Sequence, residues 1–73
     1  MDYFKRIREL REDNDYKQRE IAKLLNVGQR TYADYEYNKT RIPIGSMIIL
    51  AKFYNVDMNY ICGISDVKNT FPI

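Results

Sequence analysis

Apolar residues recur every three or four positions along most of the chain, which is the spacing of one face of an α-helix. Turn-forming residues separate these stretches, so the pattern predicts five short helices. They span residues 3 to about 13, 18–25, 29 to about 37, about 44–55 and 58–62. No stretch alternates apolar and polar residues as a strand does. We therefore expect an all-α fold, with one five-helix domain in residues 1–63 and a C-terminal tail in residues 64–73.

The apolar stripes also predict which residues face the core. The expected inward set is Phe4, Ile7, Leu10, Ile21, Ala22, Leu24, Leu25, Tyr32, Ala33, Tyr35, Met47, Leu50, Ala51 and Tyr54. Charged neighbours such as Arg6 and Arg8 fall outside the first stripe and are expected to face solvent. We expect Asn38 to end the third helix in a left-handed conformation, Asp57 to cap the last helix and Gly63 to end it.

The chain has 73 residues, of which 45% are hydrophobic and 30% charged, as in a small globular domain. Its longest apolar run, residues 47–51, is far shorter than the ~20 residues of a membrane span. The N-terminus carries no apolar signal core behind its charges. We therefore expect a cytoplasmic protein with no membrane partner.

The residues that most enzymes and metal sites need are scarce. There is no histidine and a single cysteine, Cys62, which excludes an intramolecular disulfide and the commonest catalytic and zinc-binding groupings. Cys62 lies among apolar residues and is expected to be a small buried hydrophobe. These observations argue against an enzyme, a metal or a cofactor, and the absence of a sensor domain indicates no small-molecule effector.

Positive charge is concentrated in the middle of a chain whose formal net charge is only +2. Residues 17–41 hold six basic and three acidic residues, whereas residues 42–73 are balanced. This basic part contains two predicted helices separated by three residues, the second with polar residues outward, which is the arrangement of a helix-turn-helix. A bundle of five helices would also contain such a turn. The spacing alone therefore leaves DNA binding and a purely structural turn about equally open.

The residues of this segment favour DNA binding. Residues 17–43 read KQREIAKLLNVGQRTYADYEYNKTRIP, which closely resembles the lambda-repressor-like family of helix-turn-helix domains, the Cro/CI or XRE type. The matching positions include Gln18, Ala22, Leu25, Val27, Gln29, Glu36, Pro43, Leu50, Val56, Ile61 and Gly63. Five positions depart from the family: Lys17 and Gly28 each replace a capping Ser or Thr, Asn38 replaces a glycine, and Tyr32 and Tyr35 stand where smaller aliphatic residues are common. The resemblance covers residues 3 to about 63 and implies a compact five-helix lambda-repressor-like domain with a central helix-turn-helix.

The resemblance also implies that the helix beginning at residue 29 enters the major groove of duplex DNA. Because Gln and Arg can each make two hydrogen bonds to a base edge, the expected base contacts are Gln29, Arg30, Thr31 and Asp34. The expected phosphate contacts are Lys17, Gln18, Tyr37, Lys39, Thr40 and Arg41. Arg11 and Glu36 match the family's buried ion pair, which ties the first helix to the third. The alternative for this face is a solvated helix surface followed by a mobile basic loop.

Apolar residues outside the core stripes predict a weak homodimer. Ile49 and Phe53 lie one turn apart on the fourth helix, and Phe71 and Ile73 add apolar groups to the tail. In the alternative, Phe53 packs beneath the last helix and Ile49 is a single exposed residue. Two functions therefore remain: a sequence-specific, repressor-like DNA-binding transcriptional regulator, or a helical protein–protein interaction module such as an antitoxin or phage accessory protein. The polar and basic face of the predicted helix-turn-helix favours the regulator.

Overall fold

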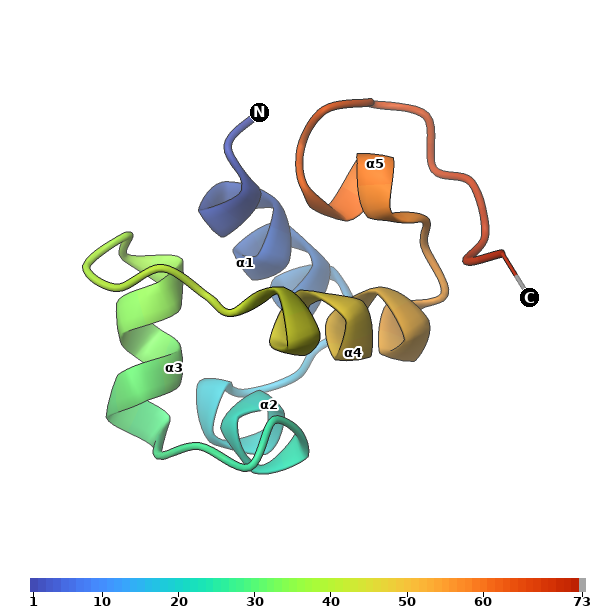
Figure 1. The fold of residues 1–73 in the computed structure, drawn as a ribbon. Helices are drawn as coiled ribbons and strands as arrows, with labels where there is room; N and C mark the ends of the chain where they lie inside the picture. Colours follow the sequence, from blue (N-terminus) through green and yellow to red (C-terminus); the bar gives the residue numbers. More distant parts are fainter. Residues whose placement is uncertain (73) are drawn as a thin grey trace.

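The computed structural model describes residues 1–72, which form five α-helices and no β-strand (Figure 1). The helices are α1 (Tyr3–Asp13), α2 (Gln18–Leu24), α3 (Gln29–Glu36), α4 (Ile44–Tyr54) and α5 (Met58–Ile61). The prediction of an all-α fold with five helices is confirmed, and each helix ends within one residue of its predicted boundary. In Figure 1, α4 crosses the middle of the molecule, α3 stands on the left, α2 lies below and α5 lies at the upper right.

The core lies where these helices meet. Its buried side chains are Ile7, Leu10, Ile21, Ala22, Leu25, Tyr32, Tyr35, Ile42, Met47, Leu50, Ala51, Val56 and Ile61. Most of the predicted inward set is therefore correct, but Phe4, Ala33 and Tyr54 are only half-buried. The prediction for Leu24 is wrong, since its side chain is 39% exposed. The side of α2 that carries Leu24 faces an open groove next to Phe53 instead of another helix.

Residues in the left-handed region follow four of the helices. Asp15, Asn26, Asn38 and Asn55 have φ angles of 60°, 58°, 58° and 54° after α1, α2, α3 and α4 respectively. Asn and Asp tolerate this conformation better than other residues with a side chain. The predicted left-handed end of α3 at Asn38 is confirmed, and short polar residues let each helix stop abruptly.

Both predictions for the ends of α5 are confirmed. Asp57 caps its N-terminus, where its Oδ1 accepts a hydrogen bond from the backbone N–H of Tyr60 at 2.8 Å. Gly63 follows the helix with a φ of 79°. A Cβ atom at Gly63 would lie only 1.8 Å from the carbonyl oxygen of Met1, so the close approach of the first residue also requires glycine.

The segment 64–72 folds back along α5 and the end of α4 (Figure 1). The backbone N–H of Asp57 donates to the carbonyl of Asn69 at 2.9 Å, and the N–H of Phe71 donates to Oδ1 of Asn55 at 3.3 Å. Phe71 is half-buried against the core, and the Lys52 ammonium lies 5.7 Å from the centre of its ring. The Phe71 ring is therefore partly covered by its own domain.

The guanidinium of Arg6 is buried, contrary to the prediction that this residue faces solvent. Its Nη1 donates to the carbonyl of Tyr60 at 2.6 Å and to that of Ser65 at 3.2 Å, and its Nη2 donates to Asp66 at 3.0 Å. The ring of Tyr60 lies 3.8 Å beneath the guanidinium carbon, at cation–π distance. Arg6 therefore joins α1 to α5 and to the segment that follows it.

Candidate nucleic-acid interface

Helix α3 presents a polar face to solvent at its N-terminal end. Gln29, Arg30 and Thr31 are exposed, and Asp34, one turn further along, is half-buried. The helix begins after Gly28, which adopts an extended conformation and supplies no side-chain cap. The side chains predicted to contact bases thus occupy the first two turns of one helix, and its opening turn is uncovered.

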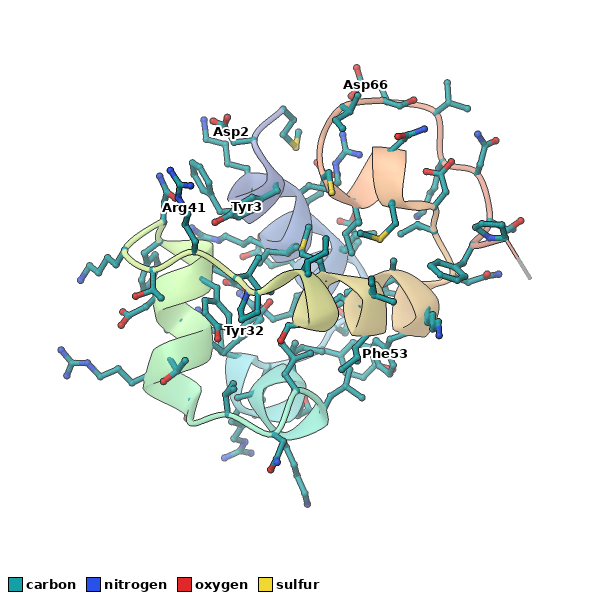
Figure 2. The ribbon with its side chains drawn as sticks, in the orientation of Figure 1. Asp2, Tyr3, Tyr32, Arg41, Phe53 and Asp66 are labelled. Carbon is teal, nitrogen blue, oxygen red and sulfur yellow. The ribbon has the colours of Figure 1, made fainter. Side chains whose placement is uncertain are left out.

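The opposite face of α3 is fixed in the core. Tyr32 is 0% exposed and Tyr35 is 5% exposed, and their rings meet edge to face with centroids 6.2 Å apart. Figure 2 shows the Tyr32 side chain between α3 and the other helices. Burial raises the pKa of the Tyr32 hydroxyl, so this hydroxyl stays protonated at neutral pH. Two large buried rings restrict both the position of α3 and its rotation about its own axis.

Arg11 of α1 and Glu36 of α3, the two residues expected to pair, lie together in a bidentate ion pair. Nε of Arg11 lies 2.7 Å from Oε2 of Glu36, and Nη2 lies 3.0 Å from Oε1. The Glu36 side chain is 0% exposed and that of Arg11 is 12% exposed. Nη1 of Arg11 also donates to the carbonyl of Tyr16 at 3.0 Å. The pair ties the end of α3 to α1 and to the turn before α2.

The electrostatics of this pair keep both groups charged. Burial alone would raise the pKa of the Glu36 carboxyl, but the hydrogen bonds from Arg11 and Gln18 outweigh it and hold that pKa below its ordinary value. The hydrogen bond with Glu36 raises the pKa of Arg11 further. The carboxylate is therefore an ion at neutral pH and accepts hydrogen bonds from two elements, α1 and α2.

Gln18, at the start of α2, contributes a contact that the sequence pattern did not reveal. Its Nε2 donates to Oε1 of Glu36 at 3.1 Å, although the two residues are 18 positions apart. An amide nitrogen has two N–H groups, so this contact uses half of its donor capacity. The start of α2 has no side-chain cap from Lys17, but the Lys17 N–H donates to Oε1 of Glu20 at 2.9 Å, which supports the first turn.

The residues after α3 form an exposed, defined turn. Tyr37, Lys39, Thr40 and Arg41 are all exposed, and Tyr37 is 56% exposed. The N–H groups of Lys39 and Thr40 both donate to the carbonyl of Asp34, at 2.9 and 3.3 Å. Figure 2 places Arg41 on the loop beyond the C-terminal end of α3. The residues expected to contact phosphate therefore lie in two places next to α3. Lys17 and Gln18 are at the start of α2, and the others are in this loop.

The residues expected at a dimer interface do not form one cluster. Ile49 and Phe53 of α4 are 42% and 40% exposed, and the Phe53 ring lies 5.2 Å from that of Tyr16. Phe53 thus packs toward the α1–α2 turn (Figure 2). Phe71 lies against its own domain, as described above, and Ile73 lies outside the described residues.

Two kinds of feature are absent from the part of the chain that the structure describes. No helix within residues 1–72 is long and apolar enough to cross a membrane. Over the same residues, no group of three or more acidic or cysteine side chains is placed to hold a metal ion.

The fold and the uncovered start of α3 define a helix-turn-helix domain, and comparison with known proteins agrees. A family model described as helix-turn-helix matches residues 7–61, which run from α1 to the end of α5. The chain belongs to this helix-turn-helix family, in the Cro/CI or XRE type that its sequence resembles.

Two relatives come from Bacillus subtilis (strain 168). The chain is 30% identical over 64 residues to the uncharacterized HTH-type transcriptional regulator YobD, covering 88% of this chain and 57% of the relative. It is 31% identical over 64 residues to the HTH-type transcriptional regulator ImmR, covering 88% of this chain and 50% of the relative. The chain therefore spans about half the length of these relatives. No solved structure matches the chain.

Proposed function

We propose that the protein is a transcriptional regulator that binds a specific sequence of duplex DNA in the cytoplasm, with the start of α3 in the major groove. The observation that carries this proposal is the division of α3 into two faces. Gln29, Arg30 and Thr31 are exposed, whereas Tyr32 and Tyr35 are held in the core. A rigid helix with uncovered hydrogen-bonding side chains at its N-terminal end suits the reading of base edges. The names of the two relatives support the same function.

In this proposal the exposed residues divide between base reading and positioning. Gln29 pairs with adenine and Arg30 with guanine, each through two hydrogen bonds, and Thr31 contacts a neighbouring base. Asp34 accepts from cytosine or orients Arg30, which precedes it by one turn. Phosphate contacts come from Lys17, Gln18, Tyr37, Lys39, Thr40 and Arg41, which position the helix without reading sequence.

A function limited to protein–protein interaction has less support. An interaction module would place apolar residues where Gln29, Arg30 and Thr31 are exposed. We further propose that the regulator acts as a weak homodimer, because two copies of α3 about one DNA turn apart, ~34 Å, would read a pair of half-sites. Repression is the expected effect, because a domain that occupies DNA can exclude other proteins from it.

Selection of random duplexes by the purified chain tests this function. We expect one sequence motif to be enriched by the wild type. Arg30→Ala should lose the preference at one position, worth about 1–3 kcal/mol of discrimination, because a bidentate base contact is removed. Arg41→Ala should weaken binding to all sequences and leave the motif unchanged. Absence of any enriched motif, or an unaltered motif with Arg30→Ala, would refute base reading by α3.

A further inference from the structure

An open groove separates α2 from the C-terminal half of α4. It has a volume of about 480 Å³ and is lined by Tyr16, Glu20, Ile21, Lys23, Leu24 and Phe53. Leu24 and Phe53 are 39% and 40% exposed, so the groove leaves apolar surface in contact with water. None of the lining residues comes from α3 or from the basic loop after it. The groove therefore includes none of the residues proposed to contact DNA, although Lys17 and Gln18 lie at the start of α2, which forms one side of it.

The outer face of α4 continues this apolar surface. Ile49 precedes Phe53 by one helical turn, so the two side chains are neighbours on that face, and Ile49 is 42% exposed. Ile48, beside Ile49, is 37% exposed. Lys52 is the one charged residue in the eleven residues of α4. A helix that is apolar on nearly all sides is normally covered by other protein.

Two charges of opposite sign stand on the α2 side of the groove. Glu20 and Lys23 are three residues apart, so they lie on one face of α2. Within residues 1–72 neither side chain forms an ion pair, and the Glu20 carboxylate accepts only a backbone N–H, that of Lys17. A partner that matches this rim must present one positive and one negative group in the reverse order.

A second copy related by a two-fold axis presents these charges in the required order. Such an interface is self-complementary, so an axis that sets Glu20 of one copy against Lys23 of the other forms the reverse pair as well. We infer that the groove between α2 and α4 is the surface at which a second copy of this chain binds, with Ile49 and Phe53 of each copy covering the other's groove. This inference rests on the proposed function only in that the homodimer would use paired half-sites.

Sedimentation equilibrium of the full chain tests the surface. The wild type should associate reversibly with increasing concentration. Ile49→Glu should raise the dimer dissociation constant by at least about tenfold, because a charge replaces a central apolar contact. Ile64→Glu is the matched control, since Ile64 is 79% exposed and follows α5, which contributes no residue to the groove, and it should associate like the wild type. A wild type that stays monomeric, or an Ile49→Glu variant that dimerises normally, overturns the inference.

A charge exchange tests the two-fold pairing independently. Glu20→Lys and Lys23→Glu should each weaken self-association by about tenfold at low salt, because every rim contact then joins like charges. A mixture of the two variants should form a heterodimer as tight as the wild-type dimer, because both ion pairs are restored. Circular dichroism melting establishes that each variant is folded. Failure of the mixture to associate better than either variant alone overturns the pairing.

Binding to a duplex with a single half-site distinguishes this inference from the proposed function. Ile49→Glu should bind one half-site with wild-type affinity and lose only the added affinity for two half-sites. If no variant binds any duplex selectively while the mixture still forms a heterodimer, the DNA-binding function fails and the interface stands. If single half-site binding is normal and no dimer forms, the interface fails and the function stands.

Discussion

The positive charges of Arg6 and Arg11 on α1 are neutralised in different ways, and this difference determines how much each residue contributes to the stability of the fold. Arg11 forms a bidentate pair with a carboxylate that is 0% exposed. Arg6 donates mainly to the carbonyls of Tyr60 and Ser65, since the two carboxylates it contacts, Asp66 and Glu9, are 91% and 40% exposed and screened by water. Loss of the Glu36 carboxylate would therefore leave a charge without its partner, whereas loss of the Asp66 carboxylate would not.

Glu36→Gln should lower the free energy of unfolding by about 3 kcal/mol, because it leaves the Arg11 guanidinium without a counter-ion in a mostly buried site. Urea denaturation measures this change. Glu12→Gln is the matched control, since Glu12 pairs with Arg8 at 3.4 Å with both side chains about half exposed. That exposed pair should contribute less than about 0.5 kcal/mol. If the two variants lose equal amounts of unfolding free energy, burial of the Arg11–Glu36 pair adds nothing to stability.

The same pair predicts a pH dependence. The pKa of Glu36 in the folded protein lies below its ordinary value of 4.5, so the folded state favours the ionised carboxyl. Its contribution to stability is complete above that ordinary value and is lost as the pH falls through the lower pKa of the folded state. The difference in melting temperature between wild type and Glu36→Gln should therefore be constant at neutral pH and shrink below pH 4.5. A difference that persists unchanged in strong acid would contradict this account.

The sequence predicted the ion pair of Arg11 but not the burial of Arg6. The pairing of Arg11 with Glu36 was expected from the resemblance to a known family. The burial of Arg6 was not, because on α1 it lies about 100° around the helix from Ile7, outside the apolar stripe. Residues 60–66 cover it, and no local pattern indicates that a segment some 54 residues away returns to this place. The Gln18–Glu36 contact was missed for the same reason.

At the scale of the elements, the sequence predicted where each helix ends but not which apolar side chains another helix covers. Turn residues act locally, so Asn38, Asp57 and Gly63 could be assigned from the sequence and are confirmed. Whether an apolar side chain is covered depends on where another helix lies. Leu24 was therefore misplaced, because only the position of α4 decides that its side of α2 borders a groove.

The left-handed end of α3 carries a stability prediction. Asn38 has a φ of 58°, which costs alanine about 1 kcal/mol more than glycine or asparagine. Asn38→Ala should therefore lower the free energy of unfolding by about 1 kcal/mol, whereas Asn38→Gly should stay within about 0.5 kcal/mol of wild type. Chemical denaturation compares them. Lys39→Ala, at the next residue, is the control and should change little. An Ala variant as stable as the Gly variant would mean that the backbone here relaxes.

At the scale of the whole molecule, charge is distributed unevenly. Basic residues predominate in residues 17–41, and α1 with its following turn carries Glu9, Glu12, Asp13 and Asp15. A polyanion approaching the molecule is therefore attracted to the segment from α2 to the loop after α3 more than to residues 1–16, where five acidic residues offset four basic ones. In the proposed function, we expect this asymmetry to orient the protein on DNA before any base is contacted.

The salt dependence of DNA binding should reflect this asymmetry. Affinity should fall linearly with salt on a double logarithmic plot, and the slope should decrease by about 0.9 for each of Lys17, Lys39 and Arg41 changed to alanine. Fluorescence anisotropy over a range of salt concentrations measures the slope. Arg8→Ala removes a positive charge from α1 and serves as the control, with an unchanged slope. A reduction of the slope by Arg8→Ala equal to that for Arg41→Ala would contradict the proposed phosphate contacts.

The contacts of Arg6 also lead to a prediction about the order in which parts of the chain fold and unfold. α2 and α3 are joined by four residues and can dock early, whereas Arg6 reaches residues 54 to 60 positions away. Closing so long a loop is entropically costly, so we expect this contact to form after the folding barrier. Arg6→Met should then speed unfolding and leave the folding rate nearly unchanged in stopped-flow measurements. We therefore expect the contacts of Arg6 to set the unfolding rate, and with it the lifetime of the folded molecule, and the helix-turn-helix to set the folding rate.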